Sequence, residues 1–212
     1  MKSLVLLLAA VLALTACSAE PTATPAAACP TEAPTSTGAQ ATLTDADQAL
    51  VTTNKGSFTM ELYGSQAPVA TANFVALARC GFYDGITFHR VLKGFVVQAG
   101  DPGTKDNRGD FAGLGAGGPG YEFEIEPPAE GLDYDPYVVA MANDTRTNGS
   151  QFFINLADLD DRLPRDYTIF GMVIDGTDVV DAIGAVPVDG AQGLPLDPVI
   201  IESIEVVKEP AG

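Results

Sequence analysis

The chain has 212 residues, enough for one domain of about 150 residues with additional segments. Hydrophobic residues make up 46% and charged residues 18%, a composition that excludes a mostly disordered chain and disfavours long charged helices. The net charge of −17 opposes nonspecific binding to nucleic acid, and three cysteines with one histidine are too few for a disulfide framework or an ordinary structural zinc site.

The N-terminus resembles a bacterial lipoprotein signal. Lys2 is followed by an uninterrupted apolar run from Leu4 to Leu14, which is too short to span a bilayer and ends in the residues Leu-Thr-Ala-Cys. We expect residues 1–16 to be a signal peptide and Cys17 to be lipidated; the alternative is an ordinary secretory signal with an incidental cysteine. Under both interpretations the protein is exported, and lipidation would anchor it to a membrane. We therefore expect an extracytoplasmic, membrane-anchored lipoprotein of the cell envelope.

A linker is expected between this signal and the domain. Of residues 18–42, 20 are Ala, Thr, Pro or Ser, and none is aromatic or branched aliphatic. Such a segment cannot bury enough apolar surface to offset its ordering entropy, so we expect residues 17–45 to be the lipidated cysteine and a disordered linker. Within it, Cys29 is either a free thiol or the disulfide partner of Cys80, and the sequence leaves both alternatives open.

Residues 46–212 show the pattern of one globular domain. Apolar residues alternate from Phe58 to Leu62, as in a strand, and a helix is expected after Pro68 and before Gly81. Short strands separated by Gly- and Pro-rich loops indicate an antiparallel barrel or sandwich. In chain order, the expected strands are Ala49–Thr53, Gly56–Tyr63, Thr87–Leu92, Phe95–Ala99, Tyr137–Ala142, Gln151–Leu156, Thr168–Val173 and Val199–Val207, and the expected helices are Val69–Arg79 and Thr177–Ile183.

Two segments of this domain contain long motifs. The first, from Phe88 to Asp101, reads FHRVLKGFVVQAGD, and the second reads MAN at 141–143, followed by NGSQFFI at 148–154. In order and spacing they resemble the cyclophilin family of peptidyl-prolyl cis–trans isomerases, or rotamases, and the resemblance extends from about Ala49 to Lys208. It implies a mostly β fold: a closed eight-stranded antiparallel β-barrel with two capping α-helices.

The implied reaction needs no nucleophile, metal or redox cofactor, and we expect none. Rotation about an amide bond faces a barrier of about 18–20 kcal/mol because the nitrogen lone pair is delocalised into the carbonyl. A donor directed at the prolyl nitrogen localises that lone pair and lowers the barrier. Arg90 is permanently charged and presents several N–H groups in a rigid fork, so it is the predicted donor.

The resemblance also implies the other site residues. The catalytic residues would be Arg90, Phe95 and Gln98, and the substrate-binding residues would be Val96, Ala142, Asn143, Gln151, Phe153, Leu163 and Tyr167. Phe152 and Phe153 are adjacent and face opposite sides of a strand, so only Phe153 is expected in the apolar pocket for the proline ring. His89 is expected to point away from the face of Arg90, as a structural histidine with a satisfied hydrogen bond.

Three features depart from the family pattern. Asp144 replaces a small apolar residue and could pair with Arg90, which would favour the alternative function, a noncatalytic proline-peptide-binding or chaperone lipoprotein. Arg162 is found where members that bind the drug cyclosporin tightly tend to have tryptophan, so weak cyclosporin binding is expected. The glycine-rich segment from Pro102 to Pro119 is expected to form a mobile loop.

The leading hypothesis is a peptidyl-prolyl cis–trans isomerase that assists the folding of exported proteins. Its expected partners are proline-containing polypeptides and, through the lipid, a membrane; no nucleic acid is expected, and the protein is expected to be a monomer. An unrelated solute-binding lipoprotein is disfavoured, because a domain of about 165 residues is small for the usual two lobes.

Overall fold

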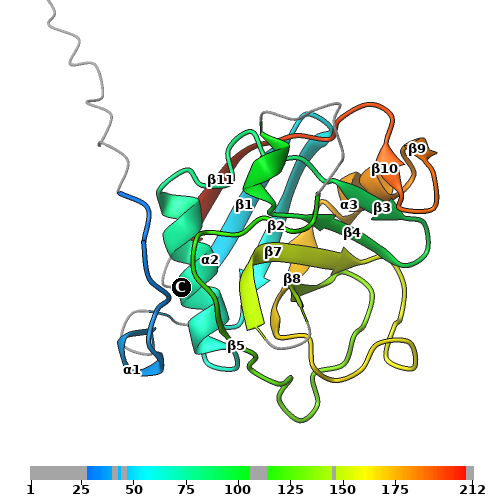
Figure 1. Ribbon diagram of the computed structural model, residues 1–212. Helices are drawn as coiled ribbons and strands as arrows, with labels where there is room; N and C mark the ends of the chain where they lie inside the picture. The colour runs from blue at the N-terminus through cyan, green and yellow to red at the C-terminus, as the bar shows by residue number, and fades with distance from the viewer. Residues whose placement is uncertain (1–27, 40–42, 44–46, 106–113, 145–146, 209–212) are drawn as a thin grey trace, which may run out of the picture.

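The computed structural model shows a curled antiparallel sheet with helices packed against it (Figure 1). The structure describes residues 28–39, 43, 47–105, 114–144 and 147–208; the expected signal peptide and the lipidation site Cys17 lie outside them. The strands are β1 Asp47–Thr53, β2 Gly56–Leu62, β3 Arg90–Leu92, β4 Val96–Ala99, β5 Phe123–Glu124, β6 Val138–Asn143, β7 Thr147–Asn155, β8 Ile169–Asp175, β9 Val188–Asp189, β10 Leu194–Pro195 and β11 Ile201–Lys208. The helices are α1 Ser36–Ala39, α2 Pro68–Arg79 and α3 Thr177–Gly184, with a 3-10 turn, η1, at Pro102–Thr104.

Eight strands follow one another in the order β11-β1-β2-β8-β6-β7-β4-β3, and β5 pairs with β7 beside this path. The prediction of a mostly β fold is confirmed. A closed barrel is not shown, because the end strands β3 and β11 do not pair as a ladder and the segments before them meet in an isolated antiparallel bridge between Thr87 and Ile200. The segments before them are joined instead, with the Phe88 N–H donating to the Val199 carbonyl (2.9 Å). On the side away from Ile200, Thr87 donates its N–H to the Thr104 hydroxyl (3.0 Å).

Both faces of the sheet are apolar, and β7 shows how one strand serves both. Phe152 lies in the main core, where its ring packs edge-on against Phe74 of α2 with centroids 5.7 Å apart. Phe153 packs instead with Val96 and Tyr134 in a second apolar cluster. Successive strand residues point to opposite faces, so the two neighbours separate as the sequence predicts, and β7 connects the core to the second cluster.

The helix α2 is fixed at both ends by residues outside it. Its first turn follows the preference for proline at N1, and the Glu126 carboxylate accepts the N–H groups of Val69 (3.0 Å) and Ala70 (2.8 Å). At the other end, Gly81 adopts φ +73°, a conformation that favours glycine and ends the helix. This predicted helix is therefore present with nearly its expected bounds.

Cys29 and Cys80 form a disulfide, one of the two alternatives that the sequence leaves open. Ala33 packs against the main core, and α1 lies against α2. Residues 28–39 therefore differ from the expected disordered linker, because a covalent bond and an apolar contact attach them to the domain. No helix in the described part of the chain is long and apolar enough to cross a membrane.

The loop expected to be mobile, from Pro102 to Pro119, is described only in part. Residues 106–113 lie outside the described residues. On either side of them, the N–H groups of Gly103, Gly115 and Gly117 donate to the Asp101 carboxylate. The described parts of this segment are thus held at one common acceptor.

Candidate active site

The register of β3, β4 and β7 places predicted site residues in one row. Arg90 lies opposite Gln98, and Gln98 lies opposite Phe153. Cross-strand partners project to the same face of a sheet, so these three side chains gather on one side of the strands. Ala142 and Asn143 adjoin this row at the C-terminal end of β6.

A pocket of about 270 Å³ opens over this row. Nine residues predicted from the sequence line it: Arg90, Phe95, Val96, Gln98, Ala142, Asn143, Phe153, Leu163 and Tyr167. The tenth predicted residue, Gln151, lines the adjoining cavity and reaches the pocket through Gln98. The pocket thus combines an apolar floor with polar groups along one side, as a binding site for a small ring flanked by amides requires.

The apolar part of the pocket is well packed. Val96 and Phe153 are 2% and 5% exposed, so their side chains form a floor rather than a surface patch. The ring of Tyr167 meets Phe153 edge-on, with centroids 5.4 Å apart and planes at 84°. These contacts hold the floor in one shape before any ligand binds.

Arg90 is half-buried at the polar side of the pocket. Its Nη1 donates to Gln98 Oε1 (3.3 Å), and its guanidinium carbon lies 6.0 Å from the centroid of the Phe95 ring. Both ion pairs among the described residues involve Arg165, and no carboxylate of the described residues lies within 4 Å of the Arg90 guanidinium nitrogens. The pairing with Asp144 that would favour the noncatalytic alternative is therefore not found among the described residues.

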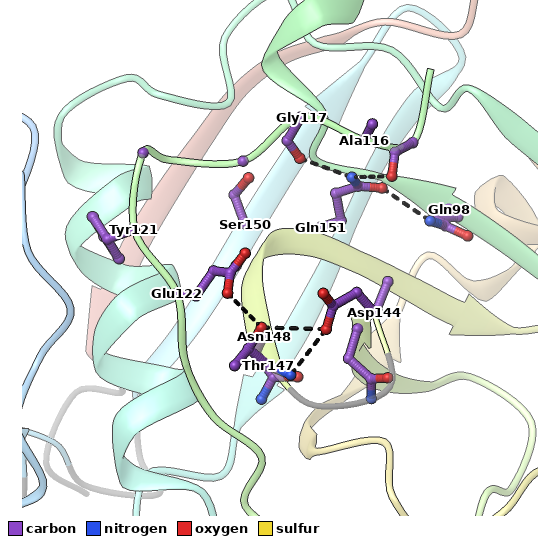
Figure 2. A pocket seen from close by; sticks show the side chains of 16 residues that line it. Gln98, Ala116, Gly117, Tyr121, Glu122, Asp144, Thr147, Asn148, Ser150 and Gln151 are labelled. Atoms are coloured by element: carbon purple, nitrogen blue, oxygen red, sulfur yellow. Dashed lines mark hydrogen bonds between the residues drawn. The ribbon is translucent and has the colours of Figure 1, made fainter. Parts of the chain in front are cut away.

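A second cavity, of about 830 Å³, shares three residues with the pocket: Gln98, Ala142 and Asn143. Two exposed carboxylates lie on its wall (Figure 2). The Thr147 hydroxyl donates to Glu122 Oε2 (2.7 Å), and Asp144 Oδ1 accepts the Thr147 N–H (3.1 Å). Asp144 thus closes the turn into β7, and this wall of the cavity is acidic.

Gln151 connects the glycine loop to the pocket. Its Nε2 donates to the carbonyl oxygens of Gly115 (2.9 Å) and Gly117 (2.8 Å), and its Oε1 accepts from Gln98 Nε2 (3.0 Å) (Figure 2). Gln151 is 8% exposed. In this structure the Gln151 amide connects the glycine loop with the Gln98 side chain.

Tyr134 supports the opposite side of the pocket and was missed by the sequence reasoning. Its hydroxyl donates to the Tyr167 carbonyl (3.0 Å) and accepts the Tyr167 N–H (3.1 Å). Burial raises the pKa of Tyr134 to about 12, so the hydroxyl stays protonated and can donate. Asn143 is held in a similar way, because its Nδ2 donates to the Asp166 carbonyl (2.9 Å). No local motif marks Tyr134, since its contact is 33 residues away in sequence.

His89 is buried, with 6% of its surface exposed, and it does not line the pocket. The expected satisfied hydrogen bond is not found in the described part of the chain, where neither ring nitrogen has a partner within hydrogen-bond geometry. Burial lowers the pKa of His89, and nearby Arg90 lowers it further, while Asp101 and the Thr87 backbone oppose the shift. The ring is therefore held in its neutral form. No group of three or more His, Cys, Asp or Glu side chains that could hold a metal ion occurs in the described part of the chain.

Comparison with known proteins agrees with this geometry. Residues 49–206 match the family "Cyclophilin type peptidyl-prolyl cis-trans isomerase/CLD". The chain is 44% identical over 173 residues to peptidyl-prolyl cis-trans isomerase A of Mycobacterium tuberculosis, covering 73% of this chain and 88% of the relative. It is 40% identical over 176 residues to peptidyl-prolyl cis-trans isomerase B of Streptomyces anulatus, covering 74% of this chain and 95% of the relative.

A solved structure shows the same fold. The crystal structure of a cyclophilin type peptidyl-prolyl cis-trans isomerase from Cryptosporidium parvum, determined in the presence of the dipeptide Ala-Pro, superposes with a TM-score of 0.67 at 36% identity. The match covers 76% of this chain and 99% of that structure.

Proposed function

Because the chain belongs to the cyclophilin-type peptidyl-prolyl cis–trans isomerases, we propose that it rotates X-Pro bonds with Arg90 as the donor to the prolyl nitrogen. The observation that supports this role is the position of Arg90: it lies at the edge of the apolar pocket, and no carboxylate of the described residues pairs with it. A proline ring on the floor formed by Val96 and Phe153 would place its nitrogen near the guanidinium.

The guanidinium would act by binding the transition state more tightly than the substrate. In a planar amide the nitrogen lone pair is delocalised and accepts hydrogen bonds poorly. As the bond twists, the lone pair localises on nitrogen and the hydrogen bond from Arg90 strengthens. Only an interaction that strengthens in this way lowers the barrier to rotation.

The polar residues around the pocket would hold the flanking peptide groups. Gln98 and Asn143 present amides at the pocket, and Ala142 has a small side chain that lets the substrate backbone approach closely. The Asn143 amide is already fixed by Asp166, so little ordering is needed on binding. Holding one side of the X-Pro bond while the other rotates is the remaining requirement of the reaction.

The test is isomerisation of a short proline peptide, measured by exchange spectroscopy in NMR. The wild-type protein should accelerate exchange, and Arg90→Ala should lose at least about 100-fold in kcat/KM with little change in peptide affinity. Arg79→Ala, which removes an exposed arginine of α2 outside the pocket, is the matched control. Unchanged activity of Arg90→Ala would reject this mechanism.

We further propose that the enzyme acts outside the cytoplasm as a lipoprotein anchored through Cys17, assisting the folding of exported proteins as a monomer. The disulfide between Cys29 and Cys80 supports an oxidising location. Replacing Cys17 by serine should release the protein from the membrane fraction, and elution at the monomer mass would support the monomer. The noncatalytic alternative depended on pairing between Asp144 and Arg90, which the described residues do not show.

A further inference from the structure

We infer that the buried carboxylate of Asp101 is a positioning residue for the Arg90 guanidinium, acting through a series of hydrogen bonds. Asp101 lies outside the pocket, and only 1% of its surface is exposed. The inference deepens the proposed function and rests on the catalytic role proposed for Arg90. The experiments below separate the two.

The series begins at the Asp101 carboxylate. Oδ1 accepts the Gly103 N–H (2.8 Å), and Oδ2 accepts the N–H groups of Gly115 (2.6 Å) and Gly117 (3.3 Å). Hydrogen bonds to an ionised acceptor are about twice as strong as those between neutral groups. One side chain therefore fixes the backbone at Gly103 and at Gly115 and Gly117, on either side of residues 106–113.

Fixing these N–H groups also fixes the neighbouring carbonyl groups. The Gly115 and Gly117 carbonyl oxygens both accept from Gln151 Nε2, at 2.9 and 2.8 Å. A flipped Gln151 amide would direct its own oxygen at two carbonyl oxygens, an arrangement with no donor. The loop therefore sets the direction of the Gln151 amide.

The orientation of the Gln151 amide in turn fixes the orientation of the Gln98 amide beside Arg90. With both Nε2 protons of Gln151 directed at the loop, its Oε1 accepts from Gln98 Nε2 (3.0 Å). Gln98 then directs its own Oε1 at Arg90, whose Nη1 donates to it (3.3 Å). If the series were broken, Gln98 could flip and present its NH₂ group to the guanidinium, which would push Arg90 away from its present position.

A second connection leads from Asp101 to the strand that bears Arg90. The Asp101 carbonyl accepts from the Thr104 hydroxyl (2.8 Å), and this hydroxyl accepts the Thr87 N–H (3.0 Å). Thr87 precedes Arg90 by three residues. Asp101 is thus connected by hydrogen bonds both to the backbone that leads into Arg90, through Thr104 and Thr87, and to the Arg90 side chain, through the glycine loop, Gln151 and Gln98.

The glycine loop offers a matched pair of variants. A Cβ atom on Gly117 would overlap the Asp101 carboxylate, whereas a Cβ on Gly118 would meet no atom within 4 Å. Gly117→Ala should therefore displace the carboxylate or the loop, and Gly118→Ala is the control. Asp101→Asn is the direct variant, because its amide nitrogen cannot accept an N–H.

Both Asp101→Asn and Gly117→Ala should lower kcat by about tenfold and leave KM within twofold of the wild-type value, because Arg90 acts mainly in the transition state. The side-chain NH₂ resonances of Gln98 and the Nε–H resonance of Arg90 should shift in both variants and not in Gly118→Ala. Urea unfolding of each variant shows whether it is folded. A folded Gly117→Ala protein with wild-type kcat and resonances would overturn the inference.

A double-mutant cycle with Gln151→Ala separates positioning from a general structural effect. Gln151→Ala cuts the series, so adding Asp101→Asn should cost less than twofold more in kcat if Asp101 acts through Gln151. A further tenfold loss would overturn the inference while leaving the role of Arg90 intact. Failure of the proposed mechanism differs from this, because Arg90→Ala itself would then retain wild-type activity.

Discussion

The stability of the folded chain should depend on pH through its only histidine, His89. Burial lowers the pKa of this group, and its ring nitrogens have no partner among the described residues. An unfolded histidine titrates near pH 6.5. As the pH falls below about 6.5, the unfolded chain therefore takes up a proton that the folded chain does not, and stability falls until the lowered pKa of the folded state is reached.

The size of this effect follows from linkage. One proton taken up only by the unfolded state costs up to about 1.4 kcal/mol of unfolding free energy per pH unit. In His89→Leu, a neutral side chain of similar volume, this slope is absent. At pH 7 the variant should be within about 1 kcal/mol of the wild type, because no hydrogen bond to the described residues is lost.

Urea unfolding at pH 7, 6 and 5 measures both curves. The chain has no tryptophan, so circular dichroism is the appropriate signal. Taking the difference between wild type and variant removes contributions from carboxyl groups such as Asp84, whose pKa burial raises. If the two curves stay parallel from pH 7 to pH 5, His89 is not held neutral by burial, and the reasoning is refuted.

Three further predictions concern the disulfide, drug binding and substrate charge. Replacing Cys29 and Cys80 by serine should lower the unfolding free energy by about 2–4 kcal/mol, since the disulfide closes a loop with a sequence separation of 51. The replacement should leave kcat/KM unchanged. Equal unfolding free energies of the wild type and the serine variant would contradict this prediction. Arg162 donates to the Gly94 carbonyl (2.9 Å) and its guanidinium lies over the Phe95 ring (4.7 Å), so cyclosporin should bind weakly. Arg162→Trp should tighten cyclosporin binding at least tenfold, as measured by calorimetry. A nanomolar dissociation constant for the wild type would contradict this prediction. Glu122 and Asp144 make one cavity wall acidic, so at low salt a peptide with Lys beside proline should show a lower KM than a peptide with Glu there. The double variant Glu122→Gln, Asp144→Asn should lose this difference in KM. A wild-type KM that does not depend on peptide charge would exclude this role of the two carboxylates.

The residues that the family resemblance implied for the site lie together largely because they belong to short motifs on neighbouring strands. Arg90 and Gln98 are eight residues apart on the adjacent strands β3 and β4, so local alternation brings them to one face. The separation of Phe152 from Phe153 follows from the same alternation. These features depend on local geometry and on motif order, both of which can be seen in one chain.

The features that the sequence did not predict depend on contacts between distant segments. The Thr87 N–H finds its acceptor at the Thr104 hydroxyl, which no periodicity indicates. Tyr134 reaches Tyr167 across 33 residues, and the choice between a free and a bonded Cys29 required its position relative to Cys80. Whether His89 has a partner among the described residues could not be foreseen either, because burial alone does not show which polar groups lie within reach.

The disulfide and the pocket lie at different places in the fold. Cys29 is bonded to Cys80 at the C-terminal end of α2, whereas the pocket is lined by residues of β3, β4, β6 and β7 and of the loops beside them. If Cys17 is lipidated as proposed, only 11 residues lie between it and Cys29, a reach of at most about 40 Å when fully extended. In that case the disulfide would determine which part of the domain stays near the membrane. From residue 46 onward the chain has 25 acidic and 10 basic residues, so repulsion from anionic headgroups, effective over about 8–10 Å, would act on the whole domain. A short attachment beside α2 combined with this repulsion would leave the pocket accessible to exported chains.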